Sequence, residues 1–355
     1  MCNHLDEQAT PPCRTVFARP RGKRTTPVPE RLPHPGLEAC RIRSIELLKN
    51  LAETTRAQQP VFLTLAAAGS LGRLEAGPDS DFDSLFIVAD DTPMSPDTDQ
   101  TVREAIAAVF ARARECGLAV PKADGIFRAA ITPASLVDPA ALGSLDESPA
   151  TFGRRMQLLL DARPIFGVDA FCQLRAGVLD WYCSPARSLP AEAPWDYLQG
   201  DLVRYACAYR NWQSFRHART AEDSWALRQA KLRLVRYVTW MGLYLLVAEA
   251  RAMGGQAEAW LLSQLELTPL ERIVHVLEGE APQAAARIVE AYGEGLMLLH
   301  DPAVRRALIA STAPDTVQLP PALVRINELA DAIREALQEF MVARCVNDPR
   351  RALPF

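Results

Sequence analysis

Hydrophobic positions follow helix-like and strand-like spacings in turn through the first part of the chain. Apolar residues recur at helical spacing, then gather in short runs separated by turn residues. The expected elements are, in order, a helix over 37–57, strands at 61–65 and 85–88, a helix over 100–116 and a strand at 125–132. This order predicts an α/β (α+β) domain with a small mixed sheet over residues 37–145.

The pattern becomes helical after about residue 146 and stays so almost to the end. The expected helices cover 152–160, 168–180, 195–216, 222–250, 256–265, 269–277, 282–300, 302–310 and 321–344. We therefore expect an all-α domain over 146–355, with the boundary in the proline- and glycine-rich stretch 135–150. Residues 1–36 are rich in proline and arginine and poor in apolar residues, which predicts a disordered basic tail.

Composition narrows the class of protein. With 355 residues the chain can form two domains, and its 49% apolar and 23% charged residues are typical of soluble globular proteins. The net charge of −4 argues against a surface that binds nucleic acid throughout. The eight cysteines are scattered, without C-x-x-C spacing. The start of the chain lacks a secretory signal, and the most apolar helical stretch, 237–248, is too short to span a bilayer, so we expect a cytoplasmic protein without a membrane partner.

Candidate chemistry lies between the first two predicted strands. A Gly69-Ser70 turn follows the first strand, and Asp81 and Asp83 precede the second. On an extended strand, residues two apart share one face, so the two carboxylates can bind Mg²⁺ together. Backbone N–H groups of the turn and the Ser70 hydroxyl suit a polyphosphate. Asp124, before the predicted third strand, is the candidate for a third catalytic carboxylate.

A basic segment in the helical part is the second candidate. Residues 201–240 hold eight Lys or Arg against three Asp or Glu. Helical projection places Lys231 inside an apolar stripe, where a cation needs a partner. That partner is either a triphosphate bound by the first domain, or a nearby acid or solvent reached by a snorkelling side chain. Arg228 and Arg210 are further candidates for the same role.

The segment from Gly69 to Asp83, with the strand that follows it, resembles the DNA polymerase β-type nucleotidyltransferase superfamily. Within it, the sequence is most similar to the group of PII uridylyltransferase, glutamine synthetase adenylyltransferase and DUF294 nucleotidyltransferases, and the resemblance covers about residues 60–170. The resemblance implies that Gly69 and Ser70 bind phosphates, joined by Arg73 of the same motif. It also implies that Asp81 and Asp83 bind two Mg²⁺ ions. Neither a phosphohydrolase signature nor a regulatory domain of that group is recognisable.

The expected function is therefore Mg²⁺-dependent transfer of a nucleoside monophosphate from an NTP, such as ATP, to a hydroxyl. The acceptor would be a protein or a small molecule, and pyrophosphate would leave. A non-catalytic nucleotide-sensing module of the same fold is the alternative. A transferase acting on nucleic acid is a further one, which the basic tail permits and the low net charge disfavours.

Overall fold

A computed structural model describes residues 34–92, 96–121, 129–184, 194–220, 224–253, 257–311 and 319–347, and these residues lie in one compact unit. The predicted basic tail, 1–36, falls almost wholly outside the described residues. The predicted division into domains at residue 145 stays a prediction.

The sheet has three antiparallel strands in the order β2-β1-β3. They are β1 (Thr64–Ala67), β2 (Ser84–Ile87) and β3 (Arg163–Phe166). A small sheet followed by helices is thus confirmed, with isolated parallel bridges from Asp81 to Ala119 and from Ile87 to Ile131. Residues 125–128 of the strand predicted at 125–132 lie outside the described residues, and of the described half only Ile131 forms a bridge.

The third strand of the sheet, β3, was not predicted from the apolar pattern. Its end packs against β1 at Gly167, whose φ is +69° and where a Cβ would lie 2.1 Å from the backbone oxygen of Leu63. Only glycine allows this close, left-handed approach. The segment after residue 145 therefore completes the sheet of the first part, so the two parts of the sequence are interleaved in the fold.

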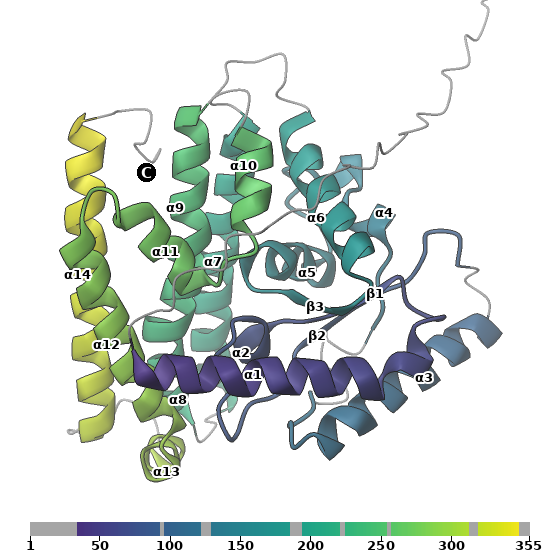
Figure 1. Ribbon diagram of the computed structural model, residues 1–355, viewed down its shortest axis with the longest axis horizontal. Coiled ribbons are helices and arrows are strands. Elements are labelled where there is room, and N and C mark those ends of the chain that lie inside the picture. The colour runs from purple at the N-terminus through teal and green to yellow at the C-terminus, as the bar shows by residue number, and fades with distance from the viewer. Residues whose placement is uncertain are drawn as a thin grey trace, which may run out of the picture. The chain divides into compact units, whose positions relative to one another are not determined.

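The two faces of the sheet belong to two hydrophobic cores. Leu65, Ala67 and Phe86 pack towards α1 (Pro35–Thr54) and α3 (Pro96–Glu115). The alternate residues, such as Ala66 and Leu85, pack towards α5 (Pro149–Leu160) and α6 (Val168–Cys183). This is the period-two alternation of a strand buried on both faces. Figure 1 shows α1 running across the view below the strands, with α5 and α6 above them.

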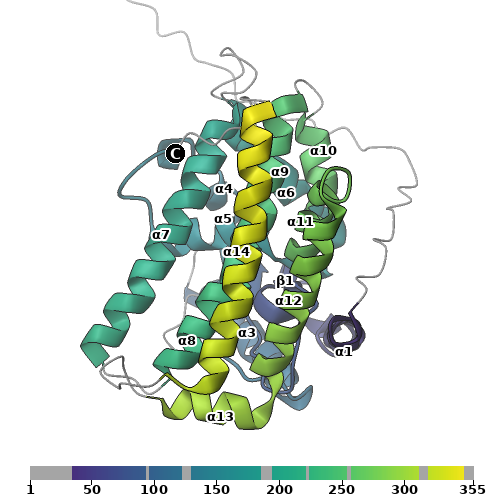
Figure 2. The ribbon, with the colours of Figure 1, turned by 90° about the vertical axis from the view of Figure 1, so that its left-hand side faces the viewer.

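The remaining helices form a bundle in which α14 packs against α12, and Figure 2 shows α14 in front. Its helices are α7 (Pro194–Thr220), α8 (Trp225–Lys231), α9 (Tyr237–Met253), α10 (Ala257–Gln264), α11 (Pro269–Leu277), α12 (Pro282–His300), α13 (Pro302–Ala310) and α14 (Pro321–Asn347). Short helices also occur: η1 (Arg56–Gln58), α2 (Gly69–Gly72), α4 (Pro133–Leu136) and η3 (Pro139–Ala141). Over the described ranges, no helix combines the length and the apolar character needed to cross a membrane.

The single helix predicted over 222–250 is wrong in one respect. Between α8 and α9 the backbone forms a π-helical turn, η5 (Leu232–Arg236). A π turn adds residues to one turn of the helix and so changes which side chains share a face. Helical projection at a constant angle cannot anticipate this change.

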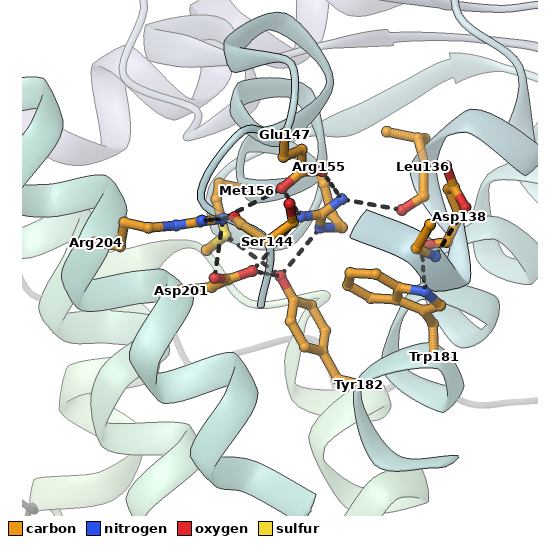
Figure 3. A network of polar contacts seen from close by, with 11 residues as sticks. Leu136, Asp138, Ser144, Glu147, Arg155, Met156, Trp181, Tyr182, Asp201 and Arg204 are labelled. Atoms are coloured by element: carbon orange, nitrogen blue, oxygen red, sulfur yellow. Dashed lines mark hydrogen bonds and ion pairs between the residues drawn. The ribbon is translucent and has the colours of Figure 1, made fainter. Parts of the chain in front are cut away.

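A buried polar network fixes α7 against α5 and α6 (Figure 3). Arg155 donates to both carboxylate oxygens of Glu147, at 2.5 and 2.7 Å, and to the hydroxyl of Tyr182 at 3.1 Å. Tyr182 in turn donates to Asp201 of α7 at 2.7 Å. Arg204 adds a hydrogen bond to the Ser144 carbonyl at 2.7 Å. Buried charges paired in this way position a helix firmly.

Candidate functional site

A cavity of about 250 Å³ lies between the Gly69-Ser70 turn and the helical bundle. From the sheet side it is lined by the turn, the D-x-D pair and the loop between them. From the bundle it is lined by five helical segments, α7, α8, η5, α12 and α13. The residues from the bundle are Tyr209, Gln213, Arg228, Lys231, Leu232, Val235, Arg236, Leu296, Leu299, His300 and Arg305. The cavity therefore brings together the two regions that the sequence singled out.

The glycine turn is shaped for close approach. Gly69 has a φ of +66°, and a Cβ there would lie 2.6 Å from Oδ2 of Asp83. Only glycine leaves the Asp83 carboxylate in this place without strain. The Ser70 hydroxyl lies 3.0 Å from the hydroxyl oxygen of Ser80, which also accepts the Gly77 N–H at 2.9 Å. The turn thus orders the loop that ends at Asp81.

Asp81 and Asp83 directly precede β2, which is the order expected from the sequence, and Asp81 forms the isolated bridge to Ala119. Both carboxylates line the cavity. Phe82 between them is fully buried and packs edge-on against Phe110, with ring centroids 6.1 Å apart. Because side chains of an extended segment alternate in direction, the burial of Phe82 leaves the carboxylates on both sides of it pointing towards the cavity.

The pair is electrostatically unfavourable when both carboxylates are charged. Burial and the neighbouring Asp81 together raise the pKa of Asp83 to about 7. Like charges held this close need a cation. Two hard oxygen donors converging on one cavity fit Mg²⁺. Within the described residues, no group of three or more His, Cys, Asp or Glu is arranged to hold a metal ion, and Asp124 lies outside them.

Arg73 lines the cavity, but its guanidinium is already paired. It donates to Glu75 at 2.7 Å and to Asp161 at 2.7 Å, and all three side chains are buried. Tyr292 of α12 donates to the other oxygen of Glu75 at 2.7 Å. The geometry gives Arg73 a structural part, joining the turn to β3 and α12. Its predicted contact with a nucleotide stays a prediction.

Lys231 is where the sequence placed it, opposite the carboxylates. Its side chain is accessible from the cavity. The surrounding protein lowers its pKa, mainly through burial, while Asp81 acts in the opposite direction. Among the described residues no acid forms an ion pair with it, and because Lys231 is exposed, the alternative that it reaches solvent by snorkelling stays a prediction, as does a nucleotide contact. Arg228 also lines the cavity, whereas Arg210 is exposed outside it.

Other cavity residues were not assigned a role from sequence: Tyr209, Gln213, Arg236, His300 and Arg305. Burial and the cations Arg305 and Lys231 lower the pKa of His300 to about 4, so it is neutral near pH 7. Arg305 forms an ion pair with Asp79 at 3.2 Å. No sequence spacing links these residues to the glycine turn, because α7, η5, α12 and α13 reach the cavity only through tertiary packing.

Residues 37–128 match the model of a family described as Putative nucleotidyltransferase DUF294. The match covers the turn and the D-x-D pair, and it confirms the resemblance predicted from them. It ends before the bundle that supplies Lys231 and Arg228. None of the curated proteins matches the chain. The matched segment supports a general role in nucleotidyl transfer.

Proposed function

We propose that the protein is an Mg²⁺-dependent nucleotidyltransferase. It would move a nucleoside monophosphate from an NTP to a hydroxyl of a protein or small molecule and release pyrophosphate. The observation that carries the proposal is one cavity in which Asp81, Asp83 and Ser70 face Lys231. Carboxylates, a glycine turn and a lysine that has no ion-pair partner among the described residues suit a metal-bound triphosphate better than any other common ligand.

Each residue has a part in this reaction. Asp81 and Asp83 would hold the metal ions, which supply charge neutralisation at the phosphates when bound. Gly69 and Ser70 would hold phosphate oxygens, and Lys231 and Arg228 would do so from the bundle. The acceptor oxygen forms a bond to the α-phosphorus while the bond from that phosphorus to the β-phosphate oxygen breaks. The protein thus acts by positioning and by electrostatics.

Calorimetry and a pyrophosphate-release assay test the proposal. We expect wild type to bind at least one NTP with Mg²⁺, and an Asp81→Asn/Asp83→Asn variant to lose at least about 100-fold of the release rate, since both changes remove charge that would hold metal. Asp169→Asn is the matched control, because Asp169 is exposed on α6 outside the cavity. Binding of no NTP by wild type would refute the proposal.

Nucleotide sensing without catalysis is the second candidate. It is favoured by one observation, the lack of a third carboxylate beside the pair within the described residues. Tight NTP binding without pyrophosphate release, over a panel of protein and small-molecule hydroxyls, would support it against the transferase.

A further inference from the structure

We propose that Arg236 binds the phosphoryl group that is transferred, and that the π-helical turn η5 places it beside Lys231 on one wall of the cavity. The inference rests on the proposed function and adds to it a residue outside the segment that resembles nucleotidyltransferases. Three observations support it: the geometry of the π turn, the surroundings of the Arg236 guanidinium, and the arrangement of charged groups along the cavity. The chemistry of arginine agrees with them.

The π turn explains why two cations five positions apart line the same cavity. In an α-helix, residues 231 and 236 would point about 140° apart, because each residue advances about 100°. In the π turn Leu232–Arg236 the hydrogen-bonding pattern is i to i+5, so residues five apart share one side of the helix, as residues four apart do in an α-helix. Lys231 and Arg236 accordingly both line the cavity. π turns often occur at functional sites.

The Arg236 guanidinium is held in place without being hydrogen-bonded. It lies over the ring of Tyr209, 5.0 Å from the centroid, and 3.9 Å from Oδ2 of Asp161. That distance is too long for a hydrogen bond, and the same oxygen already accepts from Arg73 at 2.7 Å. Across the described ranges, no group accepts a hydrogen bond from Arg236. Its planar edge therefore keeps its donors for a ligand.

The ion pairs give the cavity two different ends. Arg236 lies 3.9 Å from Oδ2 of the buried Asp161, whose backbone packs against Gly72 of the turn that also holds Asp83 at Gly69. At the other end, Arg305 pairs with Asp79 at 3.2 Å, and the neighbouring Ser80 accepts from Ser70 at 3.0 Å. The Asp83 and Arg236 end thus suits the α-phosphate, and the Ser70 and Lys231 end suits the β- and γ-phosphates.

An arginine is the appropriate cation at that position. As the acceptor oxygen bonds to the α-phosphorus and pyrophosphate leaves, charge is carried by the two non-bridging oxygens of that phosphate. A guanidinium can donate to both oxygens at once, whereas an ammonium acts as a point charge. Tyr209, as a cation–π partner 5.0 Å away, helps to hold the guanidinium in place.

The test measures dissociation constants for the NTP that wild type binds most tightly and for its monophosphate, both with Mg²⁺. We expect Arg236→Gln to weaken both ligands about tenfold, since each loses charged hydrogen bonds to the α-phosphate. Lys231→Gln should weaken the NTP by about tenfold and the monophosphate by less than about twofold, because only the NTP carries the outer phosphates.

Arg233→Gln is the matched control. Arg233 belongs to the same π turn, but it pairs with Asp331 at 2.8 Å and does not line the cavity. It should leave both constants within about twofold. Arg236→Lys keeps the charge but lacks the paired N–H donors of the guanidinium, so it should restore part of the NTP affinity lost in Arg236→Gln. Circular dichroism and thermal melts verify the folding of every variant.

Wild-type affinity of Arg236→Gln for the monophosphate would overturn the inference and leave the proposed function standing. An equal loss with Arg233→Gln would also overturn it, by showing a structural effect of the turn. Failure of wild type to bind any NTP would instead refute the proposed function and, with it, this inference.

Discussion

At the scale of single residues, Asp83 lies where burial and a second carboxylate both oppose its negative charge. Its pKa is raised to about 7. A group whose pKa is higher in the folded state stabilises the fold most below its unfolded pKa, and this contribution is lost as the pH rises through the folded pKa. The metal-free protein should therefore lose stability between about pH 4 and pH 7 at this residue.

Asp83→Asn should remove this loss. In EDTA at pH 8, we expect the variant to melt at least about 2 °C above wild type, because it avoids burying a charge beside Asp81. At pH 4 the two proteins should melt together. Thermal denaturation across pH 4–8 measures the difference, with Asp169→Asn as the exposed control. A difference that does not change with pH would contradict the pKa argument.

At the scale of elements, the turn α2 depends on glycine for two separate reasons at Gly69. One is its left-handed backbone, with a φ of +66°, and the other is the Asp83 carboxylate 2.6 Å from where a Cβ would be. Gly143 isolates the first reason. Its φ is +72°, and nothing lies within 4 Å of a Cβ built there.

Gly69→Ala and Gly143→Ala should consequently differ. Gly143→Ala should cost about 1 kcal/mol of unfolding free energy, the cost of a left-handed alanine. Gly69→Ala should cost about 2–4 kcal/mol and also displace Asp83, weakening NTP binding by at least about tenfold. Urea denaturation and calorimetry provide the two measurements. Equal losses of stability and unchanged NTP binding would show that the Asp83 contact is unimportant.

Sequence patterns predicted the parts of the site that depend on local order. Gly69, Ser70, Asp81 and Asp83 follow one another along a strand, turn and strand, and the fold brings them to one cavity. Arg236 could not be predicted, because the π turn breaks the constant helical angle that projection assumes. The sheet partner β3 was missed because its pairing with β1 spans about a hundred residues, and no local spacing encodes it.

At the scale of the whole molecule, one buried network joins the glycine turn to distant segments. Arg73 connects the turn to Asp161 before β3, and Glu75 connects it to Tyr292 of α12. These side chains are buried, so separating the segments would leave charges without partners in a poorly hydrated place. We therefore expect the sheet and the bundle to unfold together.

Tyr292→Phe tests this coupling. The change removes one hydrogen bond to a buried carboxylate, which should lower the free energy of unfolding by about 1–3 kcal/mol. The single urea transition should persist, monitored by tryptophan fluorescence and circular dichroism together. Tyr197→Phe, at an exposed tyrosine of α7, should stay within about 0.5 kcal/mol of wild type. A neutral Tyr292→Phe would show that the bond to Glu75 contributes little.

This network also affects how a ligand enters and leaves the cavity. The buried hydrogen bond from Tyr292 of α12 to Glu75 ties the two walls together and opposes a hinge-like opening, so we expect a nucleotide to enter through the existing opening of the cavity. Pro78 and Asp79 are exposed there, and the ion pair from Asp79 to Arg305 spans that rim. Association should then be a single diffusional step into a preformed site. The charge around the opening should set its rate, which should therefore change with ionic strength.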